Sequence, residues 1–369
     1  MNRAQAGAVP IVEAKDITVS FGGQKALDVP SFRVFENEVV GVIGPNGSGK
    51  TTLLLCLTRL IRPQTGSVSY RGTPVSDSKS VLELHRRLAV VFQESLLLNN
   101  SVRDNLVTGL KLRRVPKAEI KARTEKWLER FGIAALAKRQ ARTLSSGEAK
   151  RTSLARAFAL QPEILFLDEP FTALDGPTRQ ALIEDFKNVL GETRMTTVIV
   201  THDRNEALAL TDRLAVIMNG HIVQTGTPAE VFSSPASEEI AGFVETGNII
   251  HGVVESQSEG LAMVRAGTLE VEACTDLPVG TKVILLLPYD DITLILPSAE
   301  TLTISARNRF PGRIVKMFPT GSQVRVTVDC GVPLTALITR RSGEEMGLKE
   351  GLPVVAMVKA VSIRVIGRH

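Results

Sequence analysis

The sequence predicts an α/β domain with a largely parallel sheet, followed by an all-β tail. Over the first two thirds of the chain, short β-rich runs alternate with helical patterns, which is typical of parallel strands covered by helices. After Phe243 the helical periodicity fades, and short alternating strands punctuated by Gly and Pro take over. We therefore expect the α/β domain to span residues 1–245, with a helix-rich part at about 94–160, and the tail to begin at residue 246.

The composition of the 369 residues is that of a globular protein with substantial cores, at 43% hydrophobic and 22% charged residues. The longest apolar runs, such as 283–287, have the length of a strand and are too short to span a bilayer. The first ten residues lack the apolar segment of a secretory signal, so we expect a cytosolic location. The net charge of +5 is mild, and no dense Lys/Arg stripe with interleaved aromatics is present, so we expect no nucleic-acid partner.

Four apolar runs in the α/β domain end in polar groups. Each run is continuously apolar, as expected of a strand buried on both faces of a sheet. Because open α/β sheets bind ligands at the carboxyl ends of their strands, these polar groups should meet at one edge. The runs and the residues after them are 39–43 before Gly44, 88–92 before Gln93, 164–167 before Asp168 and Glu169, and 196–200 before Thr201 and His202.

The first run leads into a glycine-rich loop. The segment from Gly44 to Thr51 fits the pattern G-x-x-x-x-G-K-[ST] between a strand and a helical run. Its glycines let backbone N–H groups close around phosphate oxygens, and the following helix adds its positive end. We expect Lys50 to reach the β- and γ-phosphates of ATP and Thr51 to ligate Mg²⁺. The residues expected to bind nucleotide in this loop are Gly44, Pro45, Asn46, Gly47, Ser48, Gly49, Lys50, Thr51 and Thr52.

The third run supplies the matching acids. Asp168 follows four apolar residues and should hold Mg²⁺ through its water shell, as the acid of a second nucleotide-binding motif does. Glu169 then faces the γ-phosphate and can orient or deprotonate the attacking water. A strand that ends in Asp-Glu is common by itself, but its pairing with the glycine-rich loop favours a catalytic function.

Between these two motifs lies the segment LSSGEAKR, residues 144–151. On this segment the sequence resembles the ABC ATPase family, whose signature reads LSGGQ, and the resemblance covers roughly residues 11 to 245. It implies that Gln93 is the Q-loop glutamine and a Mg²⁺ ligand, and that His202 is the switch histidine of catalysis. It also implies that Asp175 belongs to the D-loop at the nucleotide site and that Phe21 stacks on adenine.

The signature departs from the family pattern at Ser146, which replaces a glycine, and at Glu148, which replaces the glutamine. The resemblance implies that Ser145 and Gly147 approach the γ-phosphate with a hydroxyl and a backbone N–H. The segment also opens a helical run, 148–160, whose positive N-terminus suits an anion. We therefore expect an active ATPase.

The resemblance also implies partners. In this family the signature completes the ATP site of the other subunit, so Ser145 predicts an ATP-sandwich homodimer whose two states hydrolysis can reset. Transmembrane permease subunits would bind the motor at the cytoplasmic face of the membrane, and a substrate-binding protein would deliver cargo to them. The mostly apolar segment 94–98 is a candidate for docking a permease, and internal packing is an equal alternative for it.

The tail looks internally repeated. GVV at 252–254 and LPVGTKV at 277–283 parallel GRIV at 312–315 and LKEGLPV at 348–354. Two small OB-like barrels, 246–300 and 301–369, would account for this repeat.

The second half of the tail resembles the molybdate-binding Mop domain over about residues 301 to 369. It begins with SARN at 305–308 and carries a Thr-x-x-Ser spacing further on. Hydroxyl, amide and cationic groups are what a tetrahedral oxyanion needs, so the resemblance implies a site for molybdate or tungstate. The residues it implies are Ser305, Arg307, Asn308, Thr339, Ser342 and Lys359. A purely structural function of these polar residues is the alternative.

The leading interpretation is the ATPase subunit of an importer of molybdate or tungstate, with Mg-ATP as cofactor and a tail that senses the same ion. An importer of sulfate, sugar, iron or polyamine would keep the motor and change the cargo. A soluble ABC ATPase that acts on nucleic acid or ribosomes usually has two motors or a coiled-coil insertion, whereas this chain has one glycine-rich loop and no sustained heptads. An oxyanion-storage module would not need the ATPase motifs.

Overall fold

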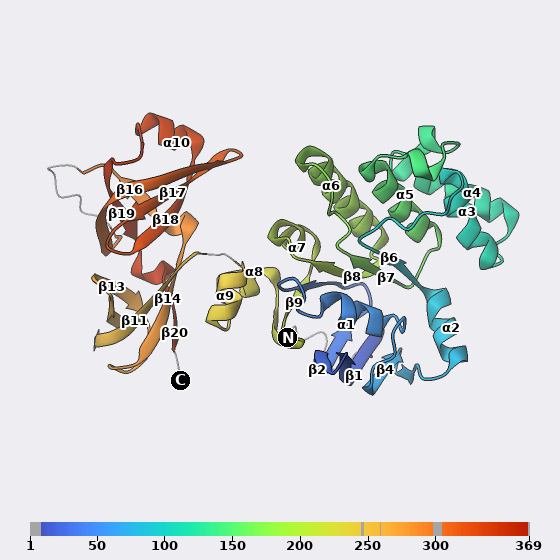
Figure 1. The fold of residues 1–369 in the computed structure, drawn as a ribbon, viewed down its shortest axis with the longest axis horizontal. Helices are drawn as coiled ribbons and strands as arrows, with labels where there is room; N and C mark the ends of the chain where they lie inside the picture. Colours follow the sequence, from blue (N-terminus) through green and yellow to red (C-terminus); the bar gives the residue numbers. More distant parts are fainter. Residues whose placement is uncertain (1–8, 245–246, 259, 298–304, 368–369) are drawn as a thin grey trace. The chain divides into compact units, whose positions relative to one another are not determined.

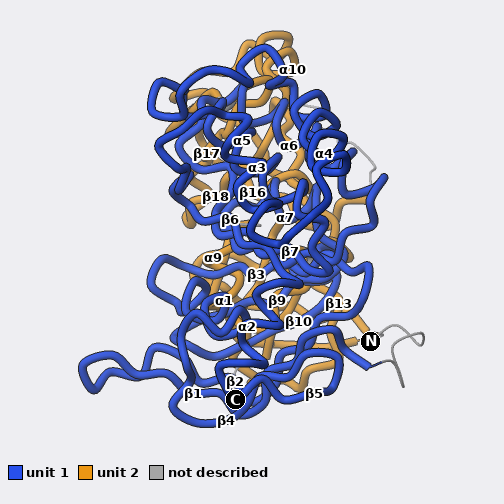
Figure 2. Tube along the Cα trace, turned by 90° about the vertical axis from the view of Figure 1, so that its right-hand side faces the viewer, with its two compact units in different colours: residues 1–231 blue, residues 232–369 orange. Residues whose placement is uncertain are grey.

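The structure, a computed structural model, describes residues 9–244, 247–258, 260–297 and 305–367. The chain divides into two compact units, Met1–Val231 and Phe232–His369 (Figure 2). The boundaries that the sequence pattern places at 245/246 and 300/301 lie outside the described residues. Within the described ranges, no helix combines the length and the apolar character needed to cross a membrane.

Unit 1 is built around a six-stranded sheet in the order β10-β9-β3-β8-β7-β6. Neighbours from β9 to β6 are parallel, while β10 pairs antiparallel with β9. The four predicted apolar strands are confirmed to within one residue at either end, and all of them lie side by side in this sheet. The strands are β3 (Val39–Ile43), β6 (Leu88–Val91), β7 (Ile164–Asp168), β8 (Thr196–Thr201), β9 (Arg213–Met218) and β10 (His221–Gly226).

A second, antiparallel sheet in the order β2-β1-β4-β5 covers the helix that follows the glycine-rich loop. This helix, α1 (Lys50–Leu57), contacts β1 and β2 of the second sheet and β7 and β8 of the first. Its Leu53 and Leu54 are fully buried in a core that both sheets share. The strands are β1 (Val12–Phe21), β2 (Gln24–Val34), β4 (Thr65–Tyr70) and β5 (Thr73–Pro74).

Helices cover the other face of the parallel sheet, and α3, α4 and α5 gather at one end of unit 1 (Figure 1). Four buried aromatic rings connect α4 and α5 to α6, with centroid distances between 4.9 Å for Trp127–Phe158 and 6.0 Å for Phe158–Phe186. Such tilted contacts favour a fixed helix arrangement over a fluid one. The helices are α2 (Ser78–Arg87), α3 (Val102–Leu112), α4 (Lys117–Arg130), α5 (Ser146–Ala159), α6 (Gly176–Thr193) and α7 (Arg204–Leu210).

The β9–β10 hairpin turns at Asn219 and Gly220, which both have positive φ angles, 49° and 82°. This is the backbone of a type I′ turn, as the Asn-Gly pair predicts. The turn supports the glycine-rich loop, because the Gly220 N–H donates to the Ser48 carbonyl at 2.9 Å.

Unit 2 consists mainly of two five-stranded antiparallel sheets that share one apolar core. Asn248 links them, since its side chain donates to the Thr335 carbonyl at 2.9 Å and accepts from the Thr335 N–H at 2.7 Å. The sheet orders are β13-β12-β11-β14-β20 and β15-β19-β16-β17-β18. The elements are α9 (Glu238–Val244), β11 (Gly247–Ser258), β12 (Leu261–Ala266), β13 (Leu269–Cys274), β14 (Lys282–Pro288), β15 (Thr293–Ile295), β16 (Asn308–Thr320), β17 (Gln323–Asp329), β18 (Pro333–Thr339), α10 (Arg340–Glu345), β19 (Pro353–Val358) and β20 (Arg364–Gly367), and α8 (Pro228–Ser233) spans the division between the units.

The two sheets do not follow the predicted division at residue 300. The early strand β15 joins β19 of the later sheet, and the last strand β20 joins β14 of the earlier one. The halves of the tail therefore exchange their final short strands. Sequence repeats do not reveal such an exchange, because each pairing joins residues far apart in the chain, Leu294 with Ala356 and Leu285 with Val365.

The compact units also divide earlier than the change of sequence pattern after Phe243. Helix α9 belongs with the β-rich unit, since Ala241 packs against Ile284 and Leu286 of β14. A helix that buries its apolar face against a sheet belongs with that sheet, whatever the local periodicity.

Candidate functional site

The glycine-rich loop connects β3 to α1 at the carboxyl edge of the parallel sheet. Gly47 and Gly49 have φ angles of 78° and 104°, a backbone region that favours glycine. Gly44 is needed for a different reason: a Cβ there would lie 2.0 Å from the Ile217 carbonyl oxygen of β9. The loop is thus held tightly against β9.

Lys50 is buried at the start of α1, and its ammonium donates to the carbonyl oxygens of Gly44 at 3.0 Å and Pro45 at 2.8 Å. Burial lowers the pKa of Lys50, and the negative charges of Glu169 and Asp168 oppose that shift. The Ser48 hydroxyl is also buried and has no hydrogen-bond partner among the described residues. Gly49, the N-cap of α1, offers no side-chain cap. These donors match the oxygens of a phosphate group.

Replacing Gly44 with Ala should destabilise unit 1. The added methyl group would overlap the Ile217 carbonyl and approach the Ser48 hydroxyl to 2.7 Å, so the loop or β9 must move. We expect a loss of about 1–3 kcal/mol in the free energy of unfolding, measured by urea denaturation.

The matched control is Gly191→Ala within α6, where an added Cβ meets nothing within 4 Å. It should raise the free energy of unfolding by roughly 0.5–1 kcal/mol, because alanine loses less entropy than glycine in a helix. Equal transition midpoints for Gly44→Ala and the parent protein would contradict the steric argument.

Thr51 and Asp168 form the part of the site that fits Mg²⁺. The Thr51 hydroxyl donates to the Asp168 carboxylate at 3.2 Å, across from α1 to the end of β7. Burial raises the pKa of Asp168, whereas the Thr51 hydrogen bond and the Lys50 charge lower it. A hydroxyl and a carboxylate oxygen side by side are hard donors of the kind that Mg²⁺ takes. Gln93 follows β6, the strand next to β7, so it leaves the sheet at the same edge with its side chain exposed.

Glu169 and His202 follow the neighbouring strands β7 and β8 and meet at the same edge. The Glu169 carboxylate lies 3.1 Å from His202 Nδ1, and 13% of the glutamate side chain is exposed against 47% of the histidine. Glu169 has a positive φ of 44°, and its N–H donates to the Val200 carbonyl at 2.9 Å. An unusual backbone conformation fixed by a neighbouring strand is typical of a functional position. The imidazole of His202 can therefore hold the Glu169 carboxylate in one orientation at this edge of the sheet.

The signature residues occupy the start of α5. Ser145 is the N-cap, and Glu148 closes a capping box: the Glu148 N–H donates to the Ser145 hydroxyl at 3.3 Å, and the Ser145 N–H donates to the Glu148 carboxylate at 2.7 Å. Glu148 therefore keeps the helix-capping function that a glutamine can also supply at this position. Gly147 packs against the start of α6, where a Cβ would lie 3.0 Å from Thr178. Asp175 is the N-cap of α6 and accepts from the Thr178 N–H at 3.0 Å.

Phe21 ends β1, and 58% of its side chain is exposed, although the neighbouring core residues of β1 are buried. An exposed aromatic ring at the end of a strand offers a flat apolar face that an adenine base could cover. Gly22 and Gly23, both with positive φ, follow it and turn the chain into β2.

The predicted oxyanion residues fall into two groups within one chain. Ser305, Arg307 and Asn308 lie at the beginning of β16, and Lys359 follows Val358, which pairs with Asn308. Thr339 and Ser342 lie at the end of β18 and the start of α10, where their hydroxyls are 2.8 Å apart. Thr339 pairs with Gln323, and Gln323 with Thr320 at the far end of β16. A strand of this length spans up to roughly 40 Å, so one ion cannot contact both groups of the same chain.

Two members of the first group already have partners. The Asn308 amide exchanges two hydrogen bonds of 2.8 Å with the backbone of Glu272 in β13, and Arg307 forms an ion pair with the Glu272 carboxylate. Lys359 is exposed, and no carboxylate among the described residues pairs with it. It is therefore the most available cation of the predicted set.

The sequence analysis did not identify Lys150 as a residue near the candidate nucleotide site. Lys150 lies in α5, is 4% exposed, and donates from its ammonium to the carbonyl oxygens of Phe92 (3.4 Å) and Gln93. The signal was its helical spacing: Gly147, Lys150 and Leu154 share the buried face of α5. A lysine on such a face needs buried acceptors, which a sequence does not locate.

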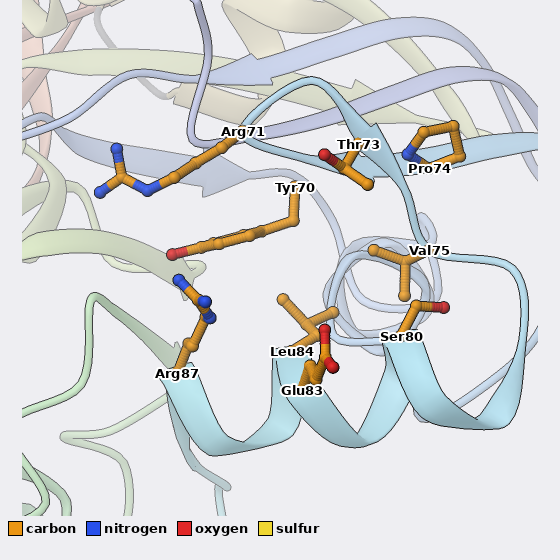
Figure 3. A pocket seen from close by; sticks show the side chains of 9 residues that line it. All are labelled: Tyr70, Arg71, Thr73, Pro74, Val75, Ser80, Glu83, Leu84 and Arg87. Atoms are coloured by element: carbon orange, nitrogen blue, oxygen red, sulfur yellow. The ribbon is translucent and has the colours of Figure 1, made fainter.

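A pocket of about 260 Å³ lies away from these motifs, between β4, β5 and α2 (Figure 3). Tyr70 forms one wall, with the guanidinium groups of Arg71 and Arg87 at 5.9 and 5.6 Å from its ring centroid. Both guanidinium groups already lie 3.1 Å from the Glu163 carboxylate, and that of Arg71 also lies 3.0 Å from the Glu36 carboxylate. Because their charges are compensated within unit 1, we assign no ligand to this pocket.

Comparison with known proteins identifies two families in the chain. The ABC transporter family model matches residues 27–172, and the TOBE domain model matches residues 304–365. The chain is 27% identical to cbiO1 of Clostridium perfringens, part of an ABC transporter complex, with a TM-score of 0.57 over 61% of this chain and 91% of that one. It is also 27% identical to the ATP-binding cassette MJ0796, a dimeric structure bound to ADP and Pi, with a TM-score of 0.54 over 59% of this chain and 98% of that one.

Curated relatives match almost the whole chain. The molybdate/tungstate import ATP-binding protein WtpC of Pyrococcus horikoshii is 37% identical over 337 residues, 91% of this chain and 94% of that protein. WtpC of Thermococcus kodakarensis is 40% identical over 77% of this chain and 82% of that protein. The sulfate/thiosulfate import ATP-binding protein CysA of Mycolicibacterium paratuberculosis is 35% identical over 92% of this chain and 87% of that protein. The chain therefore belongs to the ABC transporter family, as an ATPase whose α/β domain is followed by a β-rich TOBE domain.

Proposed function

We propose that this ATPase energises the import of molybdate or tungstate and that its tail binds the same ion. One observation supports the assignment of an ATP-hydrolysing motor: three groups of residues lie at one edge of the parallel sheet. They are Lys50, the pair of Thr51 and Asp168, and the pair of Glu169 and His202. Sulfate is the second candidate cargo, because relatives named for sulfate import match the chain about as well as those named for molybdate and tungstate.

In the proposed site each residue has one function. The loop N–H groups, the Ser48 hydroxyl and the Lys50 ammonium bind the phosphates of ATP, and Phe21 stacks on its base. Thr51, Asp168 and Gln93 would hold Mg²⁺, which would supply positive charge beside the phosphates. Glu169 orients the attacking water, and His202 holds the Glu169 carboxylate at the distance seen here.

The proposed assembly is a homodimer at the cytoplasmic face of the membrane. Ser145 and Gly147 of one copy, with Asp175 beside them, would close the ATP site of the other copy. For the permease subunits, the candidate contact is the segment after Gln93, where Leu96 is 56% and Leu98 45% exposed. A substrate-binding protein would supply the oxyanion from the other side of the permease.

The two separated groups in the tail suggest how an oxyanion could be held. One ion cannot contact both groups of the same chain. Lys359 and Ser305 lie at one end of β16, whereas Thr339 and Ser342 lie at the other. If both groups are used, two tails must contribute to each site, one with the cations and one with the hydroxyls of the α10 start. Oxyanion binding would then couple to the arrangement of the two copies and could bias the motor.

Titration calorimetry of the full-length protein tests the cargo. We expect molybdate and tungstate to bind more tightly than sulfate, because a site sized for the larger ions would hold sulfate with longer hydrogen bonds. Lys359→Ala should weaken molybdate binding by about 10- to 100-fold, the effect of losing a hydrogen bond to a charged group. Arg307→Ala and Thr339→Ala should also weaken it.

Lys282→Ala is the matched control, since Lys282 is an exposed cation of the tail outside the predicted set. It should leave the molybdate affinity unchanged. Tighter binding of sulfate than of molybdate would assign the sulfate function instead. The absence of heat with any of the three ions at millimolar concentration would remove the sensor function and leave the motor.

A further inference from the structure

Lys150 joins two segments that the proposed mechanism treats separately. It lies in α5, the helix that begins at Ser145, while its ammonium reaches the carbonyl oxygens of Phe92 and Gln93 beyond the end of β6. Phe92 is half-buried and Gln93 is exposed, so these two carbonyls lie where the chain leaves the sheet. One side chain thus connects the signature helix to the first residues of the Gln93 loop.

The connection consists of hydrogen bonds from a charged group and is sheltered from water. Lys150 is 4% exposed, so its ammonium has exchanged water for carbonyl acceptors and for the field of nearby acids. Burial lowers the pKa of Lys150, and the charges of Asp168, Glu169 and Glu206 oppose that shift. Hydrogen bonds from a buried charged group are stronger and more costly to break than those between neutral groups.

The start of α5 is also fixed on its other side. Gly147 leaves so little room that a Cβ would lie 3.0 Å from Thr178 of α6, close to Asp175. A rigid helix held at Thr178 and at the Gln93 carbonyl will move the Gln93 loop whenever the helix itself moves. The buried ammonium is costly to separate from its carbonyl acceptors, so it ties the start of the Gln93 loop to the helix.

We infer that Lys150 is a positioning residue of the ATPase, which couples the Gln93 loop to the helix of Ser145 and Gly147 so that they move together when nucleotide binds. The inference rests on the proposed function of Gln93 at the nucleotide site. Lys150 does not touch the nucleotide; it acts through the backbone of Gln93.

The test is the steady-state ATPase activity of full-length variants. Lys150→Met keeps the length and apolar part of the side chain and removes the donor, so we expect kcat to fall about 10- to 100-fold. The KM for ATP should stay within about threefold, because the glycine-rich loop and Lys50 are untouched. Lys150→Arg should restore most of kcat. The control is Lys121→Met on the exposed face of α4, which should retain the parent kcat.

A double-mutant cycle with Gln93→Ala separates positioning from general stabilisation. If Lys150 acts through Gln93, Lys150→Met should cost little further activity once the Gln93 side chain is gone. Additive losses, or a parent-like kcat for Lys150→Met beside an impaired Gln93→Ala, would overturn the inference and leave the proposed function standing. A parent-like kcat for Gln93→Ala alone would instead remove the proposed function of Gln93.

Discussion

Replacing Glu169 with Gln should abolish nearly all turnover while ATP still binds. The substitution keeps the size of the side chain beside His202 and removes the negative charge that orients or deprotonates water. We expect kcat to fall by roughly 10²- to 10⁴-fold, the contribution typical of a general base. ATP that is bound and not hydrolysed should also hold two copies together, so size-exclusion chromatography with Mg-ATP should show a dimer. Single-turnover measurements of phosphate release would give the chemical rate directly.

The matched control is Glu184→Gln, an exposed carboxylate of α6 that accepts from Gln180 one turn earlier. It should hydrolyse ATP at the parent rate and form no trapped dimer. Near-parent turnover by Glu169→Gln would exclude Glu169 from the chemical step and move the search for the base to His202 and its surroundings.

The fold of unit 1 could be predicted because its signals are local. A continuously apolar run such as 164–167 indicates a strand buried on both faces of a sheet, and the pair Asn219-Gly220 indicates the tight turn of a hairpin. The exchange of β15 and β20 between the sheets of unit 2 depends on which edge each short strand meets. The position of α9 likewise depends on Ile284 and Leu286, more than forty residues away. Such long-range choices leave no local mark in the sequence.

The residues of the candidate nucleotide site could likewise be proposed from local signals. Strand ends brought Asp168, Glu169 and His202 to one edge, because neighbouring parallel strands end side by side. The contact of Lys150 with the Gln93 carbonyl was not predictable, since it joins residues 57 positions apart through a backbone atom. The engagement of Asn308 by Glu272 was missed for the same reason. A polar residue in a motif can be a ligand or a structural link, and only its partners distinguish the two.

A mixture of two inactive variants should recover ATPase activity if each site is shared between copies. Lys50→Ala removes the cation of the glycine-rich loop, and Ser145→Arg places a bulky charge where the signature would face the nucleotide of the other copy. Homodimers of either variant would contain no intact site. A heterodimer would contain one, formed by Lys50 of the second variant and Ser145 of the first. Because half of the dimers in an equal mixture are heterodimers, activity should return to roughly a quarter of the parent value.

The control for this experiment addresses helix capping, because Ser145→Arg also removes an N-cap worth about 0.5–2 kcal/mol. Ser101 is the N-cap of α3 and accepts from the Asp104 N–H at 3.0 Å, so Ser101→Arg removes a comparable cap from a neighbouring helix. We expect Ser101→Arg alone to retain much of the parent activity, whereas Ser145→Arg alone has almost none. Substantial activity of either Lys50→Ala or Ser145→Arg alone would show that a single copy forms a complete site. Recovery in the mixture, measured as phosphate release against the mixing ratio, should peak at equal amounts, since only that ratio maximises the heterodimer.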